Sequence, residues 1–227
     1  MGLWLVTGAD RGIGQALCRL LKARGDSVIA ACFESHSSLG DEGIEIATGI
    51  DVTDARSIQA LREQVGTRRI DVLVNNAGRV IEKRFGKIES ADLLSEYAVN
   101  AVAPLMLTQV LMPCMEQGSK VVLITSRVGS LGENSSGGLY GYRMSKAAAN
   151  MAGINLSHEL KPRGIAVACL HPGSVRTQMT AGLSDVTTVG HLLEPEDSAR
   201  GLLARIDELT LETTGRFRHA SGEDLIW

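Results

Sequence analysis

Aromatic residues are scarce in this chain of 227 residues, making up only 4% of it. Proteins that bind single-stranded nucleic acid stack bases on aromatic side chains, and duplex binders carry a marked excess of positive charge. This chain has neither feature, because its formal net charge is -3 at pH 7. We therefore expect no nucleic-acid partner and no electrostatic attraction to an anionic membrane.

Long apolar runs and paired cysteines are also lacking. No apolar run reaches about 18 residues, so no membrane span is expected, and the N-terminal segment lacks the basic region of a signal peptide. The four cysteines form no C-x-x-C pair and are expected to be small buried side chains in a reducing compartment. The sequence predicts a cytoplasmic protein without a metal site, and its length fits one domain over residues 1–227.

A glycine-rich turn stands between a short apolar run, Leu3–Thr7, and a segment with leucines at helical spacing. Gly8, Gly12 and Gly14 would let the backbone turn tightly and approach a pyrophosphate at the positive end of the helix. The spacing G-x-x-x-G-x-G differs from the common G-x-G-x-x-G fingerprint, and ordinary turns use glycine too. The uninterrupted strand, turn and helix favour a nucleotide site.

The end of the second apolar run, residues 28–33, is where such folds distinguish NAD from NADP. An acidic residue there binds the ribose 2′-hydroxyl of NAD, whereas a nearby cation accommodates the phosphate of NADP. The run ends at Phe33 without an acid, and Arg11 in the glycine turn could meet a phosphate, which favours NADP. Glu34 leaves NAD open, because its carboxylate could bind the ribose hydroxyl or repel the phosphate.

Two further apolar runs end in polar motifs. Residues 44–50 lead into Asp51 and Val52, where the carboxylate could accept a hydrogen bond from an adenine amino group and the valine could offer its amide; the alternative is a plain turn aspartate. Residues 71–74 lead into Asn75-Asn76-Ala77-Gly78, whose amide side chains suit a groove of mixed polarity or an ordinary turn.

Ser126 and the segment 171–177 follow the last two apolar runs, residues 120–125 and 165–170. In open α/β sheets, ligands bind outside the carboxyl ends of the strands. Pro172 and Gly173 would turn the chain sharply there and bring backbone close to a ligand. The following segment, 178–193, has little periodicity and is expected to be a substrate lid or an ordinary surface loop.

Two helical segments carry the remaining candidates. Residues 139–160 form one long predicted helix, in which Tyr142 and Lys146 lie four residues apart on one face. An ammonium beside a phenol favours the phenolate, so we expect a lowered tyrosine pKa and a proton-transfer role. Residues 91–116 form another helical segment, in which Pro104 should break the hydrogen-bond ladder and free carbonyls near Asn100 to hold a water or a lysine.

Strands and helices alternate along the chain, which predicts an α/β fold: a single-domain Rossmann-type doubly wound parallel sheet with helices on both faces. With these motifs assembled, the chain resembles the short-chain dehydrogenase/reductase family over essentially its whole length. The segments 129–138, 142–151 and 171–179 are similar to the branch of the developmental C-factor and the carbonyl reductase sniffer. The chain departs from many NADP-using relatives at Phe33, where they have a basic residue, and in a slightly longer loop before Tyr142.

The resemblance implies hydride transfer between a nicotinamide and a small carbonyl or alcohol, with Asn100, Ser126, Tyr142 and Lys146 as the catalytic tetrad. Tyr142 would be the general acid or base. It also implies a homodimer or homotetramer formed through the long helices. The alternative is a nucleotide-binding regulatory protein with little turnover. The expected cofactor-binding residues, for NADP or NAD, are Gly8, Asp10, Arg11, Gly12, Ile13, Gly14, Phe33, Asp51, Val52, Asn76, Ala77, Gly78, Tyr142, Lys146, Pro172, Gly173, Val175 and Thr177.

Overall fold

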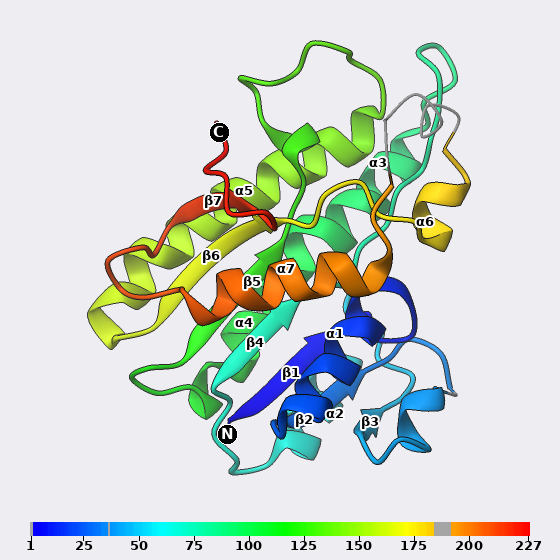
Figure 1. The fold of residues 1–227 in the computed structure, drawn as a ribbon. Coiled ribbons are helices and arrows are strands. Elements are labelled where there is room, and N and C mark those ends of the chain that lie inside the picture. The colour runs from blue at the N-terminus through cyan, green and yellow to red at the C-terminus, as the bar shows by residue number, and fades with distance from the viewer. Residues whose placement is uncertain (1, 36, 184–191) are drawn as a thin grey trace.

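The computed structural model describes residues 2–35, 37–183 and 192–227. Within these residues, seven parallel strands form one sheet in the order β3-β2-β1-β4-β5-β6-β7 (Figure 1). The chain order reverses between β1 and β4, which creates the crevice where ligands bind in such sheets. The strands are β1 Leu3–Thr7, β2 Ser27–Ala31, β3 Glu45–Ala47, β4 Val72–Asn75, β5 Lys120–Ile124, β6 Ala166–His171 and β7 Arg216–His219.

Both faces of the sheet are buried, because successive strand residues point to opposite sides and both sets are apolar. Leu5 packs into the core beneath α2, α4 and α5, whereas its neighbour Val6 packs beneath α1 and α7. The predicted doubly wound sheet is therefore confirmed. The helices are α1 Gly12–Arg24, α2 Ala55–Val65, α3 Ser90–Tyr97, α4 Ala103–Leu111, α5 Tyr140–Leu160, α6 Gln178–Ala181 and α7 Pro195–Asp207.

The predicted helical segment 91–116 is interrupted as expected, but by a π-helical turn, Ala98–Val102, between α3 and α4. Pro104 has no N–H, so the Asn100 carbonyl lacks the donor that an α-helix would supply. By length and composition alone, Ser90–Cys114 could cross a membrane. In the fold this stretch packs against α5, and its inward residues lie in the core, which is the packing of a core helix.

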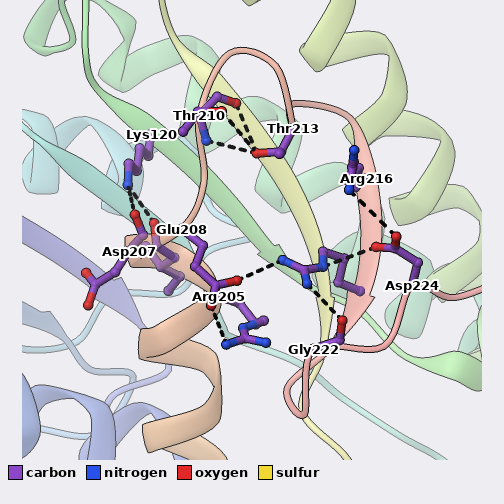
Figure 2. A network of polar contacts seen from close by, with 11 residues as sticks. Lys120, Arg205, Asp207, Glu208, Thr210, Thr213, Arg216, Gly222 and Asp224 are labelled. Atoms are coloured by element: carbon purple, nitrogen blue, oxygen red, sulfur yellow. Dashed lines mark hydrogen bonds and ion pairs between the residues drawn. The ribbon is translucent and has the colours of Figure 1, made fainter.

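The sheet edge at β7 is fixed by a network of polar contacts (Figure 2). Lys120 Nζ donates to the carbonyl oxygen of Asp207 at the end of α7. Arg218 forms ion pairs with Glu208 and with Asp224, at 3.0 and 3.1 Å. Separately, Arg127 pairs with Glu223 at 2.7 Å and the Gly132 N–H donates to the Trp227 carbonyl oxygen at 3.1 Å, which holds the C-terminal segment beside the loop that follows Ser126.

Residues 178–193 were expected to lack regular structure, but they begin with α6. The Thr177 hydroxyl accepts a hydrogen bond from the Thr180 backbone, and the Thr180 hydroxyl accepts one from the Thr177 backbone, which forms a capping box. The box was not predicted because its second member is threonine rather than glutamate. Positions 184–191 of the predicted lid lie outside the described residues.

Candidate active site

The glycine turn is shaped first by the protein's own packing. Gly8 and Gly12 have positive φ angles of 62° and 57°, which favour glycine. A Cβ on Gly8 would lie 2.8 Å from the Ala77 Cα, and a Cβ on Gly14 would overlap the Gly8 carbonyl oxygen. These positions therefore require glycine for the internal packing of the chain as well as for the expected approach of a pyrophosphate.

The start of α1 suits a bound phosphate group. Arg11 at the N-cap gives no side-chain cap, and the first turn contains no acidic residue. The first backbone N–H groups of the helix therefore have no intrahelical or capping partner, and they lie at the positive end of the macrodipole. This donor set fits the pyrophosphate of a dinucleotide.

Asp10 and Asn76 hold the glycine turn against the neighbouring strand ends. The two Asp10 carboxylate oxygens accept hydrogen bonds from the backbone N–H groups of Phe33 and Glu34, at 3.1 and 2.7 Å. The Asn76 amide donates to the Thr7 and Gly8 carbonyl oxygens, at 2.9 and 3.0 Å. Both residues lie at the predicted cofactor edge, and these hydrogen bonds shape its walls.

Arg11 and Glu34, which the sequence weighed as competing signals for NADP and NAD, form an ion pair with each other. Their side chains are 57% and 56% exposed, so the pair lies open to solvent, where the sequence predicts the adenosine end of the cofactor. The guanidinium that should meet a phosphate is therefore already bound to a carboxylate. Phe33, beside them, is 66% exposed.

Asp51 is a turn aspartate in this structure. Its Oδ1 atom accepts hydrogen bonds from the backbone and hydroxyl of Thr53, at 2.8 and 2.7 Å. The adenine contact remains a prediction. Val52, next to it, is half-buried at the edge of the crevice.

The Asn100 side chain ties the π-helical turn to two other segments. Its amide donates to the Arg79 carbonyl oxygen and to the Ser145 hydroxyl, at 2.7 and 2.9 Å, and its oxygen accepts from the Arg79 backbone N–H at 2.8 Å. Because these contacts engage the side chain, the backbone carbonyl deprived of a donor by Pro104 is the group left to hold a water. Ser145 was missed in the sequence, although it lies next to Lys146.

Lys146 is buried and Tyr142 is half-buried, with the ammonium nitrogen 5.6 Å from the centre of the phenol ring. The expected lowering of the tyrosine pKa is wrong for this structure. Burial raises the pKa of Tyr142 to about 12 and exceeds the opposing effect of hydrogen bonding with Ser126. Burial lowers the pKa of Lys146 to about 8, and the ammonium donates to the Ile124 carbonyl oxygen at 2.9 Å.

The segment from Pro172 to Thr177 faces the glycine turn across the crevice. The Cγ2 of Thr177 lies 3.2 Å from the place that a Cβ on Gly12 would take. The Pro172 carbonyl oxygen accepts a hydrogen bond from Ser198, and Val175 pairs with Leu193, so the segment is held at both ends.

Gly78 lies where the predicted groups meet. A Cβ on this residue would be 3.4 Å from the Asn100 Oδ1, 3.7 Å from the Lys146 Nζ and 3.5 Å from the Cε of Met179. Met179, on α6, was missed because a methionine in an aperiodic segment carries no signal. The structure thus brings the tetrad, the asparagine motif and α6 together at the carboxyl ends of the strands.

A family model described as short chain dehydrogenase matches residues 3–187. The chain belongs to this family. Membership makes it an oxidoreductase of the short-chain dehydrogenase type and supports NAD(P) as the cofactor. The residues around the glycine turn and Lys146 fit such a cofactor, as described above.

Two curated relatives are similar over most of the chain. The 1-hydroxy-2-glutathionyl-2-methyl-3-butene dehydrogenase of Rhodococcus sp. (strain AD45) is 40% identical over 229 residues, which is 100% of each chain. The C-signal of Myxococcus xanthus is 41% identical over 173 residues, covering 75% of this chain and all of its own length.

Two solved structures are similar in fold over the whole chain. The NADPH-bound carbonyl reductase from chicken fatty liver has a TM-score of 0.89 and 27% identity, covering 100% of this chain and 99% of its own. Carbonyl reductase Sniffer of D. melanogaster has a TM-score of 0.88 and 29% identity, covering 100% of both chains. The predicted resemblance to the C-factor and sniffer branch is confirmed by these neighbours.

Proposed function

We propose that this chain is an NADP-dependent reductase of small carbonyl compounds, with Tyr142 as the general acid. The observation that carries the proposal is the pair of half-buried Tyr142 and buried Lys146 beside Gly78, at the carboxyl edge of the sheet. Burying an ammonium and a phenol together costs free energy, so their position at the crevice favours a chemical role over a structural one.

The bound nicotinamide would supply the hydride. Tyr142 gives its proton to the substrate oxygen in reduction, and its raised pKa keeps that proton in place at neutral pH. Ser126, whose hydroxyl is part of the same hydrogen-bonding group, aligns the substrate oxygen. Lys146 holds the nicotinamide ribose, and a water on the Asn100 carbonyl returns protons to it from solvent.

The preference for NADP over NAD rests on Arg11. Its guanidinium lies at the adenosine end of the crevice, where the 2′-phosphate of NADP would replace Glu34 as its partner. A solved structure of similar fold contains NADPH, which supports the same preference. The remaining predicted cofactor residues, Asp51 and Val52 among them, would bind the adenine end.

The substrate class is proposed from the names of the similar proteins. The Rhodococcus relative is named for an alcohol that carries a glutathionyl group, and the solved neighbours are named carbonyl reductases. We propose a small carbonyl or alcohol substrate, enclosed in part by the 178–193 segment, for a one-domain cytoplasmic enzyme. The alternative of a regulatory nucleotide-binding protein is kept because a relative is named C-signal.

We also propose a homodimer or homotetramer formed through the long helices. Exposed apolar residues lie on the π-helical turn and α4, at Val102, Leu105 and Met106, and on α5, at Met144 and Met151. A second copy of the chain would cover them. Sedimentation at micromolar concentration tests this: a monomer that persists at every concentration contradicts it.

The experiment for the enzymatic proposal follows nicotinamide absorbance with NADPH and a panel of aldehydes, ketones and diketones. Tyr142→Phe is the decisive variant, and Tyr140→Phe is its matched control, because Tyr140 lies half a turn away with Met144, not lysine, four residues on. Substrate-dependent oxidation that Tyr142→Phe abolishes supports the proposal. Nucleotide binding without turnover in either direction favours the regulatory alternative.

A further inference from the structure

A buried carboxylate lies behind the active site and has no role in the proposed mechanism. Glu96, on α3, is only 1% exposed. Its Oε1 atom accepts a hydrogen bond from the Ile81 backbone N–H at 2.9 Å. Glu96 precedes Asn100 by four residues, and the Asn100 side chain bonds the Arg79 backbone. These two side chains therefore hold the chain that leaves the asparagine motif.

The other oxygen of Glu96 faces the first turn of α5. A Cβ on Gly141 would overlap Glu96 Oε2, so only glycine leaves room for the carboxylate there. The helix has no cap of its own: Leu139 at the N-cap has a φ of 43°, forms no side-chain cap, and no acidic residue follows in the first turn. The carboxylate supplies from α3 the negative charge that a helix N-terminus favours.

Few charged groups act on this carboxylate. Burial raises the pKa of Glu96, and Asp92, one turn earlier on α3, raises it further. The Ile81 N–H and the charge of Arg79 oppose this rise. From α5 the facing titratable group is Tyr142, whose pKa the Glu96 charge raises in turn. Asp92 itself has a partner in Lys83, 3.8 Å away.

We propose that Glu96 is a positioning residue for Tyr142: its carboxylate binds the Ile81 backbone N–H through one oxygen and packs against the first turn of α5 at Gly141 through the other, and so places a negative charge beside the turn that carries the phenol. The inference rests on the proposed oxidoreductase function for its catalytic meaning. Burial is the larger cause of the raised Tyr142 pKa, and the Glu96 charge acts in the same direction, which favours the acid form that carbonyl reduction needs. Oxidation requires the phenolate, which a neighbouring anion disfavours.

The test separates the effect of the Glu96 charge from the effect of its contacts with Ile81 and with α5. Glu96→Gln keeps an oxygen for the Ile81 N–H and removes the charge, whereas Glu96→Met removes both. Glu159→Gln, an exposed carboxylate on α5, is the matched control. In alcohol oxidation, both Glu96 variants should shift the acid limb of the kcat profile to lower pH by on the order of 0.5–1 unit. Only Glu96→Met should also raise KM for the substrate.

A second measurement does not depend on turnover. Tyrosinate absorbance near pH 10.5 is compared between each protein and its Tyr142→Phe counterpart, with circular dichroism showing that each is folded. Glu96→Gln should show a several-fold larger Tyr142 phenolate fraction than the parent and Glu159→Gln. If Glu96→Gln does not fold, Glu96→Met replaces it. Equal phenolate fractions overturn the inference even where the enzyme is active. An inactive parent protein with the expected absorbance difference overturns only the proposed function.

Discussion

The Asn100 amide donates a hydrogen bond to the Ser145 hydroxyl at 2.9 Å, and this hydroxyl donates at 2.8 Å to the Tyr142 carbonyl oxygen. The π-helical turn and the first turns of α5 are thereby joined through one hydroxyl. Asn100 is also bound to the Arg79 backbone, so we expect this link to fix the backbone from which the Tyr142 phenol projects.

Replacing Ser145 with alanine should therefore reduce catalysis without removing a reacting group. One buried donor of Asn100 loses its acceptor, which should cost about 1–2 kcal/mol of unfolding free energy. We expect kcat to fall about tenfold with unchanged nucleotide affinity, measured by steady-state kinetics and titration. Ser157→Ala is the control, because this buried α5 hydroxyl bonds the Ile154 carbonyl oxygen away from the site. An equal loss of kcat in both variants contradicts the assigned link.

The ion pair of Arg11 and Glu34 predicts how nucleotide choice responds to mutation. Arg11→Ala should weaken NADPH about five- to tenfold and NADH little, since an exposed pair contributes about 1 kcal/mol. Glu34→Gln should tighten the binding of NADPH, because the Arg11 guanidinium would no longer be paired with a carboxylate. Equilibrium titrations measure both effects, with Arg19→Ala as the control, because Arg19 on α1 forms a similarly exposed ion pair with Glu42 in the turn before β3. Equal weakening of NADPH and NADH by Arg11→Ala would remove the basis for preferring NADP.

The lowered pKa of Lys146 leads us to expect that the free energy of unfolding rises with pH. Its pKa is about 8 in the folded chain and is lowered from 10.5 by burial, so the unfolded chain binds more protons between these values. Stability should then increase from about pH 8 upward, by on the order of 2–3 kcal/mol near pH 10 for this group. Urea unfolding of the parent and of Lys146→Met at pH 7, 8.5 and 10 measures it. Parallel curves for the two proteins contradict a buried, charged lysine.

Gly141→Ala reverses the usual sign of such a change. Alanine within a helix normally stabilises by about 0.5–1 kcal/mol relative to glycine. Here the added methyl overlaps Glu96 Oε2 and would lie 3.0 Å from the Leu93 Cδ2, so we expect about 1–3 kcal/mol of destabilisation. Thermal unfolding measures the change. The pair Gly141→Ala with Glu96→Ala should recover part of it; a stabilised single variant shows that the overlap is relieved at no cost.

Much of the fold was predictable because apolar runs in a parallel sheet are continuous and lie between glycine and polar turns. β1 was predicted to the residue, and the strands and long helices elsewhere shifted by a few positions at most. The break at Pro104 was expected from its missing N–H, yet its π-helical form was not, because that depends on how α3 and α4 pack against α5. α6 was missed for lack of apolar periodicity.

The candidate site was also predicted in part, and some of its residues were missed. Its members were found because several motifs stand in order along the chain, so that Tyr142 and Lys146, a common spacing by itself, gain support from the glycine turn and the asparagine motif. Glu96 and Ser145 were missed because acidic and hydroxyl residues on helices are ordinary on the surface, and only the tertiary structure shows that both are buried. The pKa of Tyr142 was predicted in the wrong direction since the sequence shows the neighbouring cation but not the depth of burial.

The glycines of the first turn have a consequence for how such sequences diverge. Gly8 and Gly14 are confined by Ala77 and by each other, so substitutions there disturb the folded chain whether or not it binds a nucleotide. A descendant that lost Tyr142 and Lys146 would still be selected to keep both glycines for folding alone. The glycine turn is therefore a requirement of the folded chain, independent of the chemistry at Tyr142 and Lys146.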